Sequence, residues 1–265
     1  MGIIEPTNKS VKDFRGLHLY HTGRSNCSAR ARLLILEKHL PWTSHHIDLY
    51  TKKNISADYF GINPKGVVPT LVHDGIVIVE SNDILLYIEQ EFPEPSFTPE
   101  ARTEQDEMKT WLKRSGDIHI PGIKTYAYAK VNAALVVKTP EEVELYRELQ
   151  KDPDLLAFHA KHDLPGSNFS DEDVNSAETL LREALGEMND NIGRWGWLVG
   201  GIYSLADISW APTYTTLQRA GFPLEDYPHL APWYERIMER EAAQRALADW
   251  FREPLMGVME MAAGA

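Results

Sequence analysis

The stretch GRSNCSARAR, residues 23–32, holds the residues of this chain that are best suited to sulfur chemistry. It contains the only cysteine, Cys27, between Asn26 and Ser28, with Ser25 two positions earlier. Either Cys27 is itself a reactive thiol, or its polar neighbours stabilise a thiolate that another molecule supplies. Free cysteines are commonly small buried hydrophobes, and this segment opens an expected helix whose N-terminus favours an anion. We favour the second interpretation, with Ser25, Asn26 and Ser28 as candidate hydrogen-bond donors.

Two further motifs place polar groups where a peptide-like ligand can bind. Pro69 follows Val68 at the first position of an expected strand, where a proline is tolerated but donates no hydrogen bond to the sheet. We interpret Pro69 as part of a binding site for a peptide-like ligand, and the alternative interpretation is an ordinary proline at the edge of a strand. Glu80 and Ser81 lie where a strand ends and a helix begins, and the free N–H groups of such a helix end suit a carboxylate. Ser81 can equally serve as a helix cap, and both roles are compatible.

The composition excludes several classes of function. With 27 Lys and Arg against 39 Asp and Glu, the formal net charge is −12, which repels nucleic acid and anionic lipid over most of the surface. A single cysteine forms no internal disulfide, which indicates a reducing, cytoplasmic compartment. The opening residues do not fit a secretory signal, and no apolar run approaches the length of a membrane span. We therefore expect neither a nucleic-acid nor a membrane partner.

The first hundred residues predict a small α/β domain with a mixed sheet. The strands of its final hairpin meet at Asp74-Gly75, a strong turn signal. The proline-rich segment 93–100 is typical of a linker. The expected elements are strands at 17–21 and 45–50, helices at 28–38, 56–62 and 82–91, and two strands within 68–80.

The remainder of the chain predicts helices. Thr139 with Glu142, Ser170, and Ser204 with Asp207 have the spacing or the position of helix-capping residues. The segment 151–169 is interpreted as an irregular, polar insertion. Helices are expected at 139–150, 170–193, 204–221 and 231–251.

Together these features resemble the glutathione transferase superfamily. Its order and spacing of motifs match RSNCSARAR (24–32), NPKGVVPTL (63–71), VESNDILLYIEQ (79–90) and SLADISWAP (204–212), and PHLAPWYERIMER (228–240) is similar to its closing helix. The resemblance implies a thioredoxin-like, glutathione-binding α/β domain over residues 17–95 and an all-helical domain over 101–255, after an extension of 1–16. It also implies glutathione as co-substrate and a homodimer, with a heterodimer with a homologue as the alternative.

The resemblance implies roles for the residues of the first motif. In the serine-using zeta and theta classes the catalytic position falls on Ser25. In the bacterial β-etherases, which cleave aryl ethers, the active loop falls nearer Ser28, and Asn26 is a second donor. Both assignments are kept, with Ser25 preferred.

The same resemblance implies how glutathione is held. The family keeps the bond before the motif proline cis, so that the backbone of Val68 can pair with the cysteinyl unit, and Glu80 would meet the γ-glutamyl ammonium. Many members bind the glycyl carboxylate through Lys or Gln at the position of Val67, so in this chain Lys65 or Asn54 would take over that role. The expected glutathione-binding residues are Asn54, Lys65, Val68, Pro69, Glu80 and Ser81.

A second substrate should lie between the domains. Aromatic residues with polar tips suit an aromatic electrophile, although the same residues can be core. The expected substrate-binding residues are Trp111, His119, Tyr126, Tyr128, Trp210 and Tyr214. His45-His46 and His159-x-x-His162 have spacings that can converge on a metal, but no matching carboxylate or thiol was identified, and we expect surface histidines and no metal site.

The sequence thus predicts a glutathione-dependent transferase whose thiolate attacks an apolar, aromatic electrophile. Within the family, LEKHL (36–40) and the long segment before SLADI look most like the β-etherases. The alternatives are a zeta-like isomerase or dehalogenase of small acids, and a non-catalytic interaction subunit with the same fold.

Overall fold

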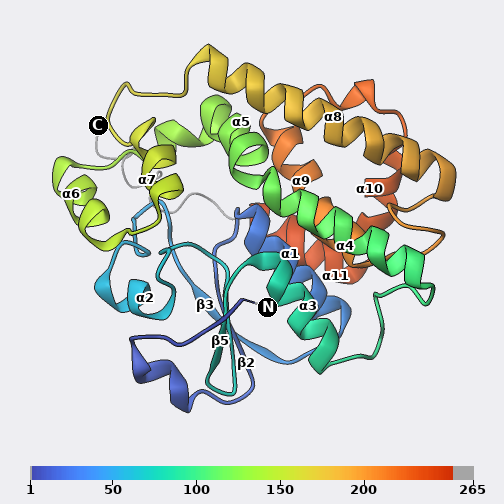
Figure 1. Ribbon diagram of the computed structural model, residues 1–265, viewed down its shortest axis with the longest axis horizontal. Helices are drawn as coiled ribbons and strands as arrows, with labels where there is room; N and C mark the ends of the chain where they lie inside the picture. The colour runs from blue at the N-terminus through green and yellow to red at the C-terminus, as the bar shows by residue number, and fades with distance from the viewer. Residues whose placement is uncertain (1, 253–265) are drawn as a thin grey trace.

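The computed structural model describes residues 2–252 of the 265-residue chain, and the predicted end of the helical domain, residues 253–255, lies outside the described residues. A sheet with its flanking helices forms one part of the molecule, and a bundle of helices forms the other (Figure 1). This is the fold class that the sequence predicts. No helix in residues 2–252 is both long enough and apolar enough to cross a bilayer.

The sheet is mixed, with strand order β1-β5-β4-β2-β3. β2 and β3 run parallel, whereas the β1–β5, β5–β4 and β4–β2 pairs are antiparallel. The hairpin between β4 and β5 turns at Asp74 and Gly75, which both have positive φ. The strands are β1 (Ile3–Ile4), β2 (Leu17–His21), β3 (Trp42–His46), β4 (Thr70–His73) and β5 (Ile76–Ile78).

Helices cover the sheet and build the second domain. The α/β part contains η1 (Lys9–Asp13), α1 (Asn26–Glu37), α2 (Ala57–Ile62) and α3 (Ser81–Glu91). The helical part begins with α4 (Arg102–Asp117), η2 (His119–Lys124), α5 (Thr125–Ala127), η3 (Tyr128–Asn132) and η4 (Ala133–Leu135). It continues with α6 (Pro140–Leu149), α7 (Pro153–Ala160), α8 (Asp171–Trp195), α9 (Leu205–Arg219), η5 (Leu224–Asp226), α10 (Leu230–Met238), α11 (Glu241–Ala243), η6 (Gln244–Ala248) and α12 (Asp249–Arg252).

Local sequence signals account for the starts of the long helices. Capping boxes are present at Thr139, Ser170 and Ser204. In each box the side chain of this residue accepts a backbone N–H of the first turn, and the side chain three positions later accepts the backbone N–H of the capping residue. Ser56 caps α2 as predicted. These caps satisfy N–H groups that have no partner inside the helix.

Three predicted elements are wrong in position or type. The second strand is Trp42–His46 rather than 45–50, because Asp48 accepts the backbone N–H groups of Tyr50 and Thr51 and turns the chain. The presumed irregular insertion 151–169 contains α7, whose first turn is capped by Asp152. The predicted helix 231–251 is broken after α10, where Arg240 adopts extended backbone angles and its guanidinium binds Glu37.

Helix α1 lies at the centre of the molecule, between the sheet domain and the bundle. It packs against α3 on one side and α9 and η6 on the other. A single hydrophobic core includes Leu34 and Ile35 of α1 together with Trp111 and Trp210 of the bundle. The two domains therefore share this core, whereas a second cluster that includes Val72 and Val77 lies within the α/β domain.

Asp207, in the first turn of α9, is a buried carboxylate with four donors. It accepts bonds from the backbone N–H groups of Leu198 (3.0 Å) and Ser204 (3.0 Å), from the Ser204 hydroxyl (3.1 Å), and from the Trp233 indole (2.8 Å). The side chain is fully buried. It links the capping box of α9 to the loop before it and to α10.

We predict that Asp207→Ala lowers the free energy of unfolding by about 3 kcal/mol, because it leaves several buried donors without an acceptor. Denaturant unfolding followed by circular dichroism measures the change. Asp190→Ala, at an exposed position of α8, is the control and should change stability by less than about 0.5 kcal/mol. Equal effects of the two substitutions would contradict this account of Asp207.

Candidate active site

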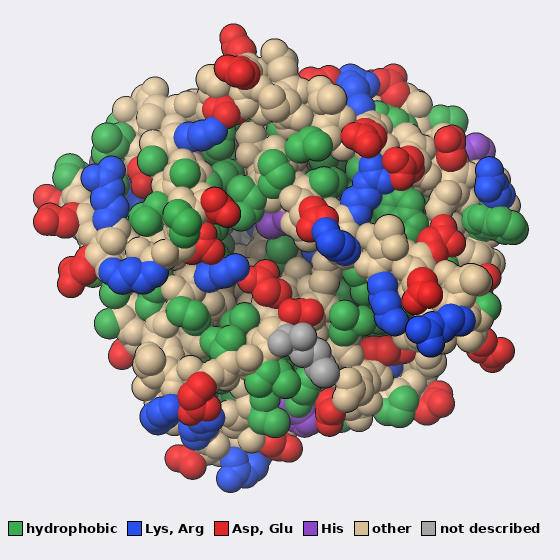
Figure 2. All heavy atoms as spheres, in the orientation of Figure 1, with side chains coloured by type: hydrophobic (Ala, Val, Ile, Leu, Met, Phe, Trp, Pro, Cys, Tyr) green, Lys and Arg blue, Asp and Glu red, His purple; other side chains and the backbone are tan. Residues whose placement is uncertain are grey.

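A cavity of about 350 Å³ lies between the two domains. The face drawn in Figure 2 is hollowed near its centre, and charged side chains of both signs surround the hollow. The lining comes from the loop before α1, the segment between α2 and β4, the start of α3, the η2–η3 region, α7 and the end of α9. Residues distant in the sequence thus meet at one site.

Ser25 lies at the cavity wall as the N-cap of α1. Its hydroxyl oxygen accepts the backbone N–H of Ser28 at 3.1 Å. A serine hydroxyl has one proton and two lone pairs. The proton of Ser25 is therefore available to a ligand in the cavity while the oxygen caps the helix.

The other two candidate donors have different surroundings. The Asn26 side-chain amide donates to the hydroxyls of Thr213 (3.1 Å) and Thr216 (3.3 Å) on α9, and its buried carbonyl oxygen has no partner among the described residues. Ser28 is fully buried, lies outside the lining, and accepts the backbone N–H of Thr22 at 3.4 Å. Of the three, Ser25 has the geometry of a donor to a ligand.

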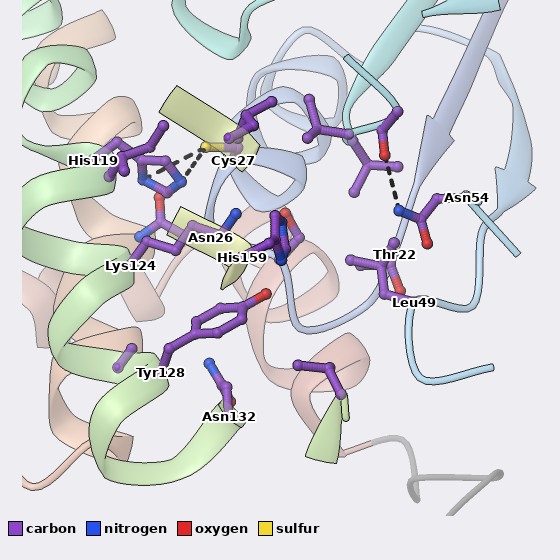
Figure 3. A pocket seen from close by; sticks show the side chains of 18 of the residues that line it. Thr22, Asn26, Cys27, Leu49, Asn54, His119, Lys124, Tyr128, Asn132 and His159 are labelled. Atoms are coloured by element: carbon purple, nitrogen blue, oxygen red, sulfur yellow. Dashed lines mark hydrogen bonds between the residues drawn. The ribbon is translucent and has the colours of Figure 1, made fainter. Parts of the chain in front are cut away.

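Cys27 also lines the cavity and contacts a histidine of the opposite wall. Its Sγ lies 3.3 Å from Nε2 of His119 (Figure 3). Burial, followed by the charges of Arg30 and Lys124, lowers the pKa of His119 to about 3. The imidazole is therefore neutral near pH 7, and its Nε2 can accept a hydrogen bond from the thiol of Cys27.

The motifs expected to bind glutathione line the same cavity. The Val68–Pro69 bond is cis, and Val68, Pro69, Glu80 and Ser81 all face the cavity. Glu80 has a positive φ of 64° immediately before α3. The hydroxyl of Ser81 accepts a bond from Arg30 at 3.3 Å, so this serine is linked to α1.

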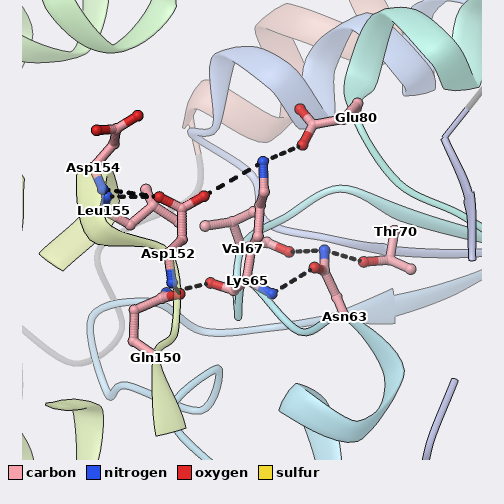
Figure 4. A network of polar contacts seen from close by, with 9 residues as sticks. All are labelled: Asn63, Lys65, Val67, Thr70, Glu80, Gln150, Asp152, Asp154 and Leu155. Carbon is pink, nitrogen blue, oxygen red and sulfur yellow. Dashed lines mark hydrogen bonds and ion pairs between the residues drawn. The ribbon is translucent and has the colours of Figure 1, made fainter.

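Lys65 sits between two carboxylates at this end of the cavity (Figure 4). Its Nζ lies 2.8 Å from Glu80 and 3.7 Å from Asp152. The hydrogen bond to Glu80 raises the pKa of Lys65. Asn54 also lines the cavity and donates to the carbonyl of Gly66 at 2.9 Å.

The predicted substrate-binding aromatics divide into two groups. His119 and Tyr128 line the cavity. The other four are buried outside its lining, which corrects the expectation that they face a ligand: Trp111, Tyr126, Trp210 and Tyr214.

Core contacts explain where these four residues lie. The Trp210 indole donates to the carbonyl of Trp111 at 3.0 Å, and the two rings meet edge to face with centroids 5.7 Å apart. Tyr126 packs against Phe222, and Tyr214 stacks on Tyr234. Such pairs are typical of aromatic packing in a core.

The helical wall of the cavity is wound more widely than an α-helix. The segments η2 and η3 are π-helical and place His119, Lys124 and Tyr128 along one wall. π-Helical turns are rare and occur frequently at functional sites. Several residues of the lining were not predicted from the sequence, among them Arg24, Lys124, Asn132, Asp152, His159 and Arg219.

The prediction of surface histidines is wrong for the pair His159 and His162. His162 is fully buried and His159 lines the cavity, and together with Asp163 they offer ligand atoms within 4.8 Å of one another. Burial and the neighbouring lysines lower the pKa of His162 to about 4. Asp163 is already paired with Lys138, so its charge is neutralised within this buried polar cluster.

Both domains of this chain are similar to known proteins. The family models for the N-terminal and C-terminal domains of glutathione S-transferase match residues 19–96 and 148–236, respectively. The chain is 28% identical over 249 residues to Protein LigF of Sphingobium sp. strain SYK-6, covering 91% of this chain and 96% of that protein. It is 27% identical over 244 residues to a tetrachloro-p-hydroquinone reductive dehalogenase of Sphingobium chlorophenolicum, covering 88% and 96%. The crystal structure of the β-etherase LigF has a TM-score of 0.79 at 26% identity, covering 87% of this chain and 98% of that one.

We predict that Cys27 reacts with a maleimide at a ratio of one label per chain, since it is the only cysteine and is partly exposed at the cavity wall. S-hexylglutathione at saturating concentration should slow labelling at least about tenfold by occupying the cavity. Mass spectrometry of the intact protein measures both rates. A labelling rate that the ligand does not change would place the ligand away from Cys27.

Proposed function

The chain belongs to the glutathione S-transferase family and is an enzyme that uses glutathione as co-substrate; on this premise, we propose that Ser25 stabilises the thiolate and that the thiolate attacks an apolar, aromatic electrophile. The observation that carries the proposal is the position of the Ser25 hydroxyl at the cavity wall. Its oxygen accepts a backbone N–H at the start of α1, so its proton is available to donate to a ligand.

The energetic requirement on Ser25 is moderate. A free thiol has a pKa of about 8.5, and lowering it by about two units requires about 2.7 kcal/mol of preferential thiolate stabilisation. A hydrogen bond from a hydroxyl to a charged acceptor supplies about 1.5–3 kcal/mol. The N-terminus of α1 adds a favourable field of about 0.3–1 kcal/mol.

Asn26 and Ser28 are less suited to this role. The amide hydrogens of Asn26 are engaged by Thr213 and Thr216, and its free carbonyl oxygen would repel a thiolate. Ser28 is fully buried behind the loop. We therefore assign activation of the thiol to Ser25 alone.

The remaining parts of glutathione are proposed to follow the charges of the lining. The γ-glutamyl carboxylate would meet Ser81 and the N-terminus of α3, and its ammonium would meet Glu80 and Asp152. Lys65 is already shared by these two carboxylates, whereas Asn54 keeps one amide N–H after its bond to Gly66. Asn54 is thus the better candidate for the glycyl carboxylate in a chain that has Val67 at the usual position.

For the second substrate we propose a β-aryl ether. The chain is similar to the β-etherase LigF over nearly the whole length of that protein. In this reaction the sulfur forms a bond to the carbon that carries the aryl ether, the carbon–oxygen bond breaks, and its electron pair leaves on the aryl oxide. Dehalogenation is the second candidate, favoured by the similarity to the reductive dehalogenase.

The test of this function compares Ser25→Ala with Ser56→Ala. Both serines are helix N-caps, but only Ser25 lines the cavity. Each substitution should cost about 1 kcal/mol of stability through loss of the cap. Ser25→Ala should also lower kcat/KM by about 10²-fold, because one donor to the reacting anion is lost, while Ser56→Ala leaves kcat/KM within about threefold of wild type.

The assay follows phenol release from β-aryl ether compounds and conjugation of 1-chloro-2,4-dinitrobenzene. Conjugation without any phenol release would reject the ether substrate and retain the transferase. The absence of both reactions would favour the non-catalytic interaction subunit. Equal activities of Ser25→Ala and wild type would reject the role of Ser25.

We also propose that the chain forms a homodimer, because two-fold symmetric homodimers are the commonest oligomers of soluble proteins. Multi-angle light scattering of the purified protein should give the mass of two chains of 30.1 kDa. A single-chain mass would contradict the homodimer. A dimer that forms only on addition of a homologous chain would support the heterodimer instead.

A further inference from the structure

The cavity has a charge pattern opposite to that of the chain as a whole. The formal net charge of the protein is −12, yet six basic and only three acidic side chains line the cavity. Two of the acidic residues, Glu80 and Asp152, surround Lys65 at the end proposed for the γ-glutamyl group. The third, Asp154, follows Asp152 in the first turn of α7. Three of the six basic residues, Lys124, Lys138 and Arg219, lie on the helical wall of the cavity.

Lys124 is the distinctive cation of that wall. Within residues 2–252 no carboxylate lies within ion-pair distance of its Nζ, whereas the neighbouring Lys138 is paired with Asp163. The Lys124 ammonium lies over two aromatic rings, 4.3 Å from the ring centroid of Phe158 and 5.3 Å from that of Tyr128. An ammonium group held over rings in a cavity wall keeps its hydrogen-bond donors free for a ligand.

The local helix geometry brings this ammonium to the reacting part of the cavity. Lys124 ends the π-helical segment η2, which begins with His119. His119 reaches the loop of Ser25 and Cys27 through its contact with Cys27, and Lys124 lies beside His119 on the same wall (Figure 3). The apolar residues Ile120 and Ile123 lie on this wall as well, so a substrate there meets the Lys124 ammonium next to apolar and aromatic side chains.

We propose that Lys124 binds the aryl oxygen of the leaving group of the second substrate and protonates it as the carbon–oxygen bond breaks. The inference rests on the proposed function and extends it to the leaving group. The glutathione thiolate forms the carbon–sulfur bond, the carbon–oxygen bond breaks, and the electron pair goes to the aryl oxygen. The Lys124 ammonium donates a proton to that oxygen, which gives a phenol and a neutral amine, and solvent reprotonates the amine.

The surroundings of Lys124 also suit proton donation. Burial lowers the pKa of Lys124 to about 8, with the charge of Lys138 acting in the same direction and Cys27 opposing it. The ammonium is thus the main form at pH 7 but gives up its proton more readily than an exposed lysine. The active form is the protonated one, so activity toward poor leaving groups should decline as the pH rises through about 8.

The first experiment measures kcat/KM for a series of β-aryl ethers whose phenols differ in acidity. Lys124→Met should lower kcat/KM by about 10²–10³-fold for weakly acidic phenols and by less than about threefold for nitrophenols, which leave without a proton. The alkaline decline near pH 8 should be absent from Lys124→Met. Lys130→Met is the matched control, because Lys130 is exposed on the neighbouring segment η3 and lies near a tyrosine ring but does not line the cavity.

The dependence of the loss in kcat/KM on the substrate distinguishes protonation of the leaving group from other roles of Lys124. If Lys124 acted on the glutathione thiolate, Lys124→Met would lose the same factor with every ether and with 1-chloro-2,4-dinitrobenzene, and the inference would be overturned. Equal losses in Lys124→Met and Lys130→Met, or no loss in either, would overturn it as well. Retained thiolate formation in Lys124→Met shows that the glutathione site is intact.

A binding measurement tests the inference even if no ether is cleaved. Wild type should bind 4-nitrophenolate at least about tenfold more tightly than Lys124→Met does, whereas both should bind neutral 4-nitroanisole equally. Equal affinities of the two proteins for 4-nitrophenolate would reject Lys124 as the oxygen site. Failure of the proposed function itself would appear separately, as the absence of glutathione conjugation in wild type.

Discussion

The burial of two arginines on helix α1 is the constraint on which the site depends. Arg30 and Arg32 are 1% and 0% exposed, and an isolated buried charge costs several kcal/mol unless hydrogen bonds compensate for it. Arg32 donates to the carbonyls of Thr22 (2.8 Å), Gly23 (2.8 Å) and Ala246 (3.1 Å). The loop that leads to Ser25 is therefore held between α1 and the C-terminal helices.

Arg30 extends the same constraint to the second glutathione-binding motif. Its guanidinium donates to the hydroxyl of Ser81 at 3.3 Å and to the carbonyl of Ser115 at 3.4 Å. Asn82 joins this network through Ser115 and Ser209. One helix thus links the thiolate site, the N-terminus of α3 and α4, the helix that leads into the η2 wall of the cavity.

Much of the fold was predictable because it follows from short-range signals. The capping residues Thr139, Ser170 and Ser204, and the turn at Asp74 and Gly75, each specify local backbone structure. Helix α7 was missed although Asp152 followed by Pro153 is a recognisable start, because the helix is short and the residues that follow it, 161–169, are largely polar.

The candidate site was less predictable on its helical side. Five of the six glutathione-side residues belong to the motifs 63–71 and 79–90, and all six, Asn54 included, line the cavity. Trp111 and Trp210 carry no mark in the sequence that separates a core aromatic from one facing a ligand, and their mutual packing decides the outcome. The π-helical turns have no sequence signature of their own, so the position of Lys124 required the three-dimensional structure.

The most direct test of the account is the ionisation of bound glutathione. Ultraviolet difference absorbance records thiolate formation as glutathione is titrated into wild type and Ser25→Ala between about pH 5 and pH 9, a range that spans the free thiol pKa of about 8.5. The account predicts a thiolate that titrates well below that value in wild type and close to it in Ser25→Ala. The same low pKa in both proteins would contradict the assignment of Ser25, and the absence of a thiolate in wild type would contradict the proposed chemistry.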